Sequence, residues 1–237
     1  VNTLVAALAN VVLPIYFDLT KHKACNALPQ QNERKRRVIV SLTSFPKRLA
    51  TLHLVIESIL RQSVKPDKVV LYLTKSQVPD VEKLPRKLLD CRKRGLKIVL
   101  CDDEIRSHTK YFYAMQEFPD DIVITVDDDL FYRSDLVATH LMNADKYPGC
   151  VIANWVKRII PGKTKYTEWP DASGKEPVKS KNMLILGVSS VLYPPHSLHR
   201  DAFNVENIRE LTLTADDVWI TAMLLKQGTN VVYTGYK

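Results

Sequence analysis

Apolar and polar positions alternate along the chain in blocks that predict strands and helices in turn. Short apolar runs rich in β-branched residues predict buried strands at residues 38–42, 68–74, 96–101 and 122–126. Between them, apolar residues recur every three or four positions, as in amphipathic helices, over residues 49–62, 81–94 and 110–117. Gly95 follows the second of these helices as a terminator. The alternation predicts βαβ units, and therefore a mainly parallel sheet with helices on both faces.

The pattern is less regular after residue 130. We expect a helix at 136–146, a strand at 150–156, a loop rich in Pro, Gly and Lys at 160–181, and a strand interrupted by Gly187 at 183–193. A last helix is expected over residues 213–225, with Thr214 as its N-cap. These elements fit one α/β domain.

The first 36 residues predict a separate helix and a basic linker. The first 17 carry no charge, but Asn2, Asn10 and Pro14 interrupt them, and they fall short of the ~20 apolar residues of a membrane-spanning helix. We expect a helix that packs on the domain, with a helix lying in a membrane interface as the alternative. The linker ends in a charged run at residues 33–37, which either stays solvated or contacts acidic lipid or phosphate.

Composition narrows the class of partner. The 237 residues are 46% apolar and 25% charged, which suits a globular domain, and the formal net charge of +8 favours anionic partners such as nucleotide phosphates or an acidic membrane face. The basic residues are not interleaved with aromatic ones, so nucleic acid is not an expected partner. The cysteines are far apart, which favours reduced thiols in the cytoplasm; they are Cys25, Cys91, Cys101 and Cys150.

The main chemical signal is the run Asp127, Asp128 and Asp129 directly after an apolar strand. Adjacent carboxylates repel one another unless a cation gathers them. Strand side chains alternate, so Asp127 and Asp129 are expected on one face and Asp128 on the other. Carboxylates suit Mg²⁺ or Mn²⁺, which keep water and phosphate oxygens as further ligands. The run therefore predicts a metal that bridges to a diphosphate, and a solvated acidic turn is the alternative.

Polar loops follow each of the four strands of the first half. They comprise residues 43–48, 74–76, 102–110 and 127–129. Because ligands of open α/β sheets bind outside the carboxyl ends of the strands, the aspartates are expected where a ligand binds.

Taken in order, these parts resemble the GT-A class of nucleotide-sugar-dependent glycosyltransferases, in particular small bacterial enzymes of polysaccharide or glycan assembly. The matching pieces are VSLTSFPKRL, ESILRQSVKPDKVVLYL, SHTKYFYAM, VDDDLFY, LGVSSVLYPP and TADDVW, within residues 37–235. The resemblance implies a GT-A type, Rossmann-like, mainly parallel sheet flanked by helices in a single domain at residues 37–237. Its donor half would be about residues 37–130 and its acceptor half about 131–237.

The resemblance also implies roles for single residues. Asp129 would be the main ligand of Mn²⁺ or Mg²⁺, and Asp127 would contact the ribose or, through water, the metal. Asp128 would hold the sugar or the local loop. The remaining donor-binding candidates follow the first three strands, and they are Thr43, Ser44, Arg48, Asp102 or Asp103, and Lys110.

An acidic pair precedes a helix in inverting members of the class, and Asp216 and Asp217 match it. One of them, with Asp217 favoured, would be the general base that an acceptor hydroxyl needs. The alternative is that both only complement the helix dipole. Many members also add a late histidine to the metal shell, for which only His196 and His199 are near.

The implied reaction is metal-dependent transfer of a sugar from a nucleoside-diphosphate sugar, with a UDP-sugar favoured, to a hydroxyl of a glycan or lipid-linked glycan. It would proceed by direct displacement with inversion, in the cytoplasm or at the inner face of the membrane with peripheral contact. A dehalogenase-type phosphoryl transferase fits poorly, because Leu130 and Phe131 follow Asp129. A nucleotidyltransferase remains an alternative, although it would usually have a Gly-rich first loop, and so does a nucleotide- or glycan-binding protein without turnover.

Overall fold

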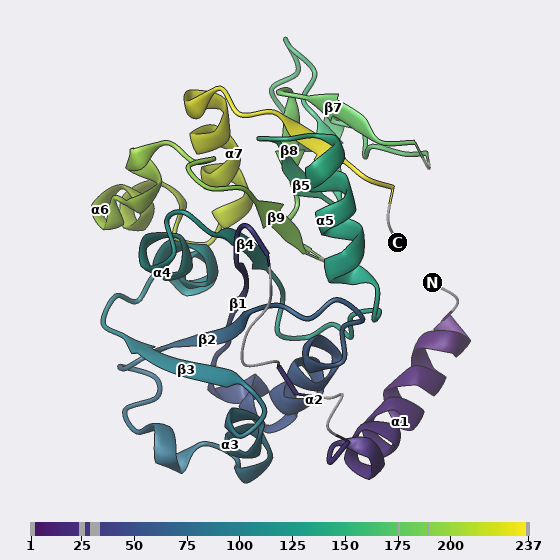
Figure 1. Cartoon of the computed structure of the whole chain (residues 1–237). Coiled ribbons are helices and arrows are strands. Elements are labelled where there is room, and N and C mark those ends of the chain that lie inside the picture. Colours follow the sequence, from purple (N-terminus) through teal and green to yellow (C-terminus); the bar gives the residue numbers. More distant parts are fainter. Residues whose placement is uncertain (1–2, 24–26, 29–33, 175, 189, 236–237) are drawn as a thin grey trace.

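The computed structural model describes residues 3–23, 27–28, 34–174, 176–188 and 190–235. It confirms the mainly parallel, Rossmann-like α/β sheet with helices on both faces (Figure 1). The eight strands of the main sheet run in the order β3-β2-β1-β4-β9-β5-β10-β7. Their bounds are β1 Val38–Thr43, β2 Lys68–Thr74, β3 Leu96–Cys101, β4 Ile122–Thr125, β5 Val151–Ala153, β7 Val178–Ser180, β9 Val191–Tyr193 and β10 Val231–Tyr233.

Neighbouring strands from β3 to β4 are parallel, whereas β9 is antiparallel to both β4 and β5. A second, two-stranded sheet pairs β6 (Val156–Arg158) with β8 (Met183–Ile185). The main sheet therefore runs through both halves of the chain.

The α-helices are α1 Thr3–Thr20, α2 Leu49–Leu60, α3 Arg86–Arg92, α4 Thr109–Glu117, α5 Leu136–Lys146, α6 Val205–Asn207 and α7 Asp216–Gln227. Short 3-10 turns lie at Pro46–Arg48, Val81–Lys83, Arg106–His108, Tyr166–Glu168 and Arg200–Phe203, and a π-helical turn lies at Ile208–Thr212.

The core lies on both faces of the sheet. On one face, α2, α3 and α5 contribute Ile56, Leu88 and Val137 to a cluster with Leu42 of β1. On the other face, α4 packs against β1, β2 and β4, and α7 packs against the second half of the sheet. Strands covered on both faces have no solvent side, which explains their uninterrupted apolar runs in the sequence.

The expected helix over 81–94 is wrong in one respect, because it is divided at Pro85. A 3-10 turn ends at Lys83, Leu84 is extended with ψ 155°, and α3 begins at Arg86. Proline disfavours the helical conformation in the residue before it, which breaks the periodic pattern into two pieces. The chain then turns at Gly95, whose φ is +114°.

Two expected strands of the second half are also wrong as single elements. The run 150–156 divides into β5 in the main sheet and β6 in the small sheet, and the run 183–193 divides into β8 and β9 in the same way. The expected loop over 160–181 contains β7. An apolar run has the same composition whichever sheet it joins, so only tertiary pairing separates these strands.

The last helix begins at Asp216 rather than Leu213. Its N-cap residue is Ala215, without a side-chain capping bond, so the expected cap by Thr214 is wrong. The backbone N–H of Trp219 donates to Ala215 O at 3.2 Å, so Ala215 provides the first carbonyl of the helix and Thr214 lies outside it.

The N-terminal helix is present as α1, beside α2 at the edge of the molecule (Figure 1). Two residues discussed above lie outside the described residues, namely Cys25 and the first residue of the charged run, Glu33. The other three cysteines, Cys91, Cys101 and Cys150, are buried free thiols. Within the described residues, no helix is both long enough and apolar enough to cross a lipid bilayer.

Candidate functional site

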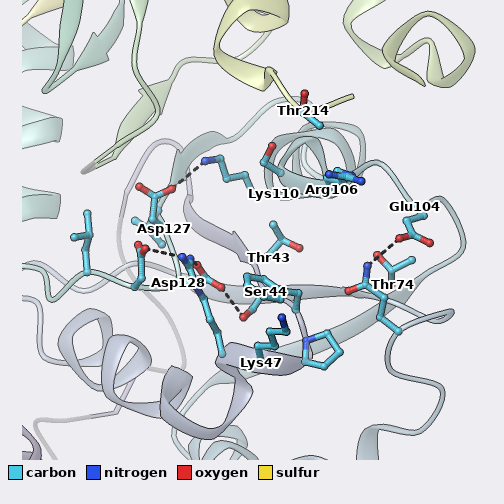
Figure 2. A pocket seen from close by; sticks show the side chains of 18 of the residues that line it. Thr43, Ser44, Lys47, Thr74, Glu104, Arg106, Lys110, Asp127, Asp128 and Thr214 are labelled. Atoms are coloured by element: carbon cyan, nitrogen blue, oxygen red, sulfur yellow. Dashed lines mark hydrogen bonds and ion pairs between the residues drawn. The ribbon is translucent and has the colours of Figure 1, made fainter. Parts of the chain in front are cut away.

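The carboxyl ends of β1 and β4 lie side by side at the point where the strand order reverses, since the chain passes from β1 to β2 and β3 before it returns to β4. Open α/β sheets bind ligands in the crevice at this point. A cavity of about 920 Å³ opens there (Figure 2), and we call it the switch-point pocket. It is lined by residues 43–48, 74, 77, 104, 106, 107, 110, 126–130, 188 and 214.

Two of the three aspartates hold the loop that follows β1. The Asp128 carboxylate is buried; it accepts a hydrogen bond from Ser44 Oγ at 2.6 Å and forms an ion pair with Arg48. Arg48 Nη2 also lies 3.0 Å from Asp129 Oδ2, and the Asp129 side chain is 48% exposed. The hydrogen bond to Asp128 and its charge raise the pKa of the Arg48 guanidinium.

Asp127 turns the other way, toward Lys110 on α4 (Figure 2). Asp127 and Asp128 therefore point in different directions, as the alternation of strand side chains predicted. The same alternation predicted Asp129 on the side of Asp127, and this is wrong, because Asp129 shares Arg48 with Asp128. The reason is that β4 ends at Thr125, so the aspartates lie beyond the strand.

Lys110 is a buried cation surrounded by carboxylates. Its Nζ lies 3.1 Å from Asp127 Oδ1 and 3.5 Å from Asp216 Oδ2, and its side chain is 9% exposed. Burial alone would lower the pKa of this ammonium, but the negative charges of Asp216 and Asp127 outweigh burial and raise it. Lys110 therefore remains charged and links the aspartate run to the acidic pair on α7.

The acidic pair lies behind Lys110, at the start of α7. Asp216 Oδ1 accepts a hydrogen bond from Ser107 Oγ at 2.8 Å, whereas its buried Oδ2 has no hydrogen-bond partner among the described residues and only the ionic contact with Lys110. Asp217 Oδ1 accepts from the Gly187 backbone N–H at 2.8 Å. Neither carboxylate lines the switch-point pocket.

Burial and the neighbouring charge of Asp216 raise the pKa of Asp217 to about 6. Burial likewise raises the pKa of Asp127, and the Lys110 charge opposes that rise. Three carboxylates around one ammonium leave excess negative charge in a region with little water, so the site favours the uptake of a proton or a further cation.

Few side chains in the pocket could bind a divalent cation. Asp127 and Asp129 both line the pocket, and the charge of Asp129 is close enough to add to the rise in the pKa of Asp127. In the described part of the chain, no three or more His, Cys, Asp or Glu side chains form a group that could hold a metal. Two carboxylates fit Mg²⁺ or Mn²⁺ held jointly with water and phosphate oxygens rather than an ion caged by protein.

The late histidines do not join these aspartates. His196 Nε2 lies 3.0 Å from Asp120 Oδ1, and His199 Nδ1 lies 3.6 Å from Asp201 Oδ2. Both histidines follow β9, which runs antiparallel to β4, so they emerge at the sheet edge opposite Asp129.

The other predicted donor residues divide into two groups. Thr43, Ser44 and Arg48 line the pocket, whereas Asp102 and Asp103 do not. Asp102 pairs with Lys75 at 2.6 Å, and Asp103 accepts a hydrogen bond from the Tyr113 hydroxyl at 3.0 Å.

Further polar residues reach the pocket that the sequence reasoning did not single out. Glu104 lines it and accepts hydrogen bonds at 3.0 Å from Ser76 Oγ and Gln77 Nε2, and two more cations, Lys47 and Arg106, line it as well. All of these residues lie in or beside the polar loops after β1, β2 and β3, so their position in these loops is the sequence feature that could have identified them.

No protein-family model matches the chain, and no curated protein matches it either. Among solved structures, the chain is similar to CMP:2-keto-3-deoxy-manno-octonic acid synthetase complexed with CTP, at 14% identity over 84% of this chain and 88% of that chain, with a TM-score of 0.47. It is also similar to mannosyltransferase PcManGT from Pyrobaculum calidifontis in complex with GDP-Man and Mn²⁺. That match has 19% identity over 62% of this chain and 44% of that chain, with a TM-score of 0.38.

Proposed function

We propose that this chain is a glycosyltransferase that moves a sugar from a nucleoside-diphosphate sugar, a UDP-sugar by preference, to a hydroxyl of a glycan or lipid-linked glycan. The observation that carries the proposal is the switch-point pocket, in which a run of aspartates faces several cationic side chains. The resemblance of the sequence motifs to the GT-A class supports the same function.

The charges of the pocket match a diphosphate bound together with a divalent cation. Lys47, Arg48, Arg106 and Lys110 line the pocket and offer positive charge to phosphate oxygens. Carboxylates at the same wall would repel a free diphosphate, unless a metal ion bridges the two. A volume of about 920 Å³ is within the usual range for small-molecule sites.

Asp127 and Asp129 would hold Mn²⁺ or Mg²⁺ in this pocket. Such an ion, when bound, neutralises the charge that develops on a diphosphate leaving group. Lys110 also lines the pocket and would add a second positive charge beside the metal. The carboxylates of Asp127 and Asp216 keep its ammonium protonated. Asp128 acts indirectly, since its bonds to Ser44 and Arg48 hold the loop after β1 in place.

Asp217 is the proposed general base, with Asp216 as its alternative. A carboxylate whose pKa is raised to about 6 accepts a proton more readily than an exposed one and is still ionised at neutral pH. The acceptor hydroxyl would give its proton to Asp217 while its oxygen bonds to the anomeric carbon. The bond from that carbon to the diphosphate oxygen breaks on the opposite side, which inverts the configuration.

Calorimetric titration with UDP, with and without Mn²⁺, tests the donor site. We expect binding that needs the metal and that weakens at least about tenfold in Asp129→Ala. The protein offers the metal only the carboxylates of Asp127 and Asp129 in this proposal, and the variant leaves one of them. Asp90→Ala, which removes an exposed carboxylate on α3, should bind as the native chain does. If no nucleoside diphosphate binds under any metal condition, the proposal is wrong.

Turnover separates the transferase from its alternatives. A glycosyltransferase releases UDP from a UDP-sugar when an acceptor is present, a nucleotidyltransferase releases pyrophosphate from a nucleoside triphosphate, and a binding protein releases neither. The anomeric configuration of the product, read by NMR, then tests inversion.

A further inference from the structure

The helix α1 carries an apolar stripe that faces solvent. Its members follow one another at helical spacing, and they are Leu8, Val11, Val12, Ile15 and Leu19, which are 49% to 77% exposed. Single exposed apolar residues are ordinary on a protein surface, but a continuous stripe along one side of a helix indicates a surface that is covered by something else.

The other side of α1 is fixed to the domain. Phe17 is buried, and its ring meets the edge of the Phe131 ring at a centroid distance of 6.1 Å. Arg61 lies over the Phe17 ring and donates hydrogen bonds to Phe17 O at 3.1 Å and Thr20 Oγ1 at 2.8 Å. The buried Glu57 carboxylate holds Arg61 at 3.0 Å. These contacts set the orientation of α1, so the stripe faces away from the domain.

Charges around the helix select an anionic occupant. The acidic side chain of α1, Asp18, is already paired with Lys21 and Lys87. Lys23, just after the helix, is exposed and cationic.

A second group of cations lies at residues 34–36. Arg34 donates to Lys65 O at 2.5 Å and to Asp67 Oδ2 at 3.0 Å, so it is held by the segment that follows α2 and Arg61, and the exposed Lys35 and Arg36 come directly after it. Basic residues that accompany an exposed apolar helix suit the headgroups of acidic lipids. A second copy of this chain, with its own charge of +8, would instead be repelled.

We propose that the stripe of α1 docks this protein on an anionic lipid membrane, with the helix lying in the interface. Pro14, inside the helix, cannot donate to the Asn10 carbonyl. Water and headgroups can satisfy that carbonyl in the interface, whereas the hydrocarbon core cannot. The contact between Phe17 and Phe131 places α1 beside the loop that carries Leu130 of the switch-point pocket. On the proposed function, on which this step rests, a docked α1 brings the pocket close to acceptors anchored in the lipid.

Vesicle flotation with the full chain tests the proposal. We expect binding to vesicles of phosphatidylcholine with phosphatidylglycerol, weaker binding to phosphatidylcholine alone, and a loss of at least about tenfold when Ile15→Glu is combined with Leu19→Glu. Removing the charges with Lys35→Gln and Arg36→Gln should cost about fivefold per cation, and less at high salt. Met142→Glu, at a side chain that is 63% exposed on α5, is the matched control and should bind normally.

Three results would overturn the proposal. They are no binding to any vesicle, equal binding by the double-glutamate variant, and a dimer in sedimentation velocity that this variant dissociates, which would make a second copy the occupant. UDP titration of the same variant reports on the pocket independently. Lost flotation with intact UDP binding is the expected result, and a chain that floats but binds no nucleotide would reject only the proposed transferase.

Discussion

Replacing Asp217 by Asn should stabilise the fold at neutral and higher pH. Folding raises the pKa of this carboxyl from 3.8 to about 6, because it is buried and lies beside Asp216. A raised acid pKa means that the folded state binds the proton more tightly than the unfolded chain. Stability is therefore lost as pH rises from the unfolded pKa to the folded pKa, and it remains lower above that window.

The size of the effect follows from the two pKa values. A difference of about 2 units corresponds to about 3 kcal/mol of unfolding free energy, an upper figure because nearby groups adjust when Asp217 ionises. Asn does not ionise in this pH range, and its amide oxygen can still accept the hydrogen bond from the Gly187 N–H. The variant should gain most of this free energy at about pH 8 and almost none at about pH 4.

Urea unfolding of both proteins across this pH range measures the difference, and subtraction cancels the groups that titrate equally in both. Asp90→Asn is the control, because a hydrogen bond from Lys93 lowers the pKa of that exposed carboxyl and its difference curve should run weakly in the opposite direction. A stability difference for Asp217→Asn that is the same at both ends of the pH range would show that folding does not raise the pKa of Asp217.

The same substitution separates stability from chemistry. If Asp217 is the base, the rate of transfer should rise with pH through about 6, and Asn should lower kcat by about 10² to 10⁴. A variant that is both more stable and inactive would show that this site stores unfavourable burial for the sake of catalysis. An active Asn variant would transfer the role to Asp216.

Three further substitutions test the surroundings of the site. Lys110→Met leaves the carboxylates around it without their cation and should cost about 3–5 kcal/mol in urea unfolding, with a larger loss at high than at low pH. Glu57→Gln removes the buried charge that holds Arg61 and Arg94, which donate to Phe17 O in α1 and to Lys21 O just after it. It should cost about 3 kcal/mol and make the segment at residues 20–23 an early cleavage site in limited proteolysis. Gly187→Ala places a Cβ 2.9 Å from Asp217 Oδ1, so it should displace that carboxylate, cost about 1–3 kcal/mol and shift its pKa in an NMR titration.

Much of the first half of the fold is predictable from local pattern alone. Strands covered on both faces appear as uninterrupted apolar runs, and the amphipathic helix expected at residues 49–62 appears as α2, Leu49–Leu60. Because parallel strands place their carboxyl ends at one edge, the position of Asp127 to Asp129 at the pocket also followed from the sequence. The protein's charge predicted an anionic partner without saying which.

Tertiary structure decided the pairings. The sequence indicated that residues 183–193 are apolar, but only the sheet shows β9 inserted between β4 and β5 while β8 joins another strand. The sequence marked Lys110 of α4 and the acidic pair of α7 as separate candidates, because about a hundred residues lie between them. In the structure they form one cluster around Lys110 Nζ. Local periodicity records which side of an element is buried, whereas partners distant in sequence are chosen by packing and charge in three dimensions, and the site is built from such partners.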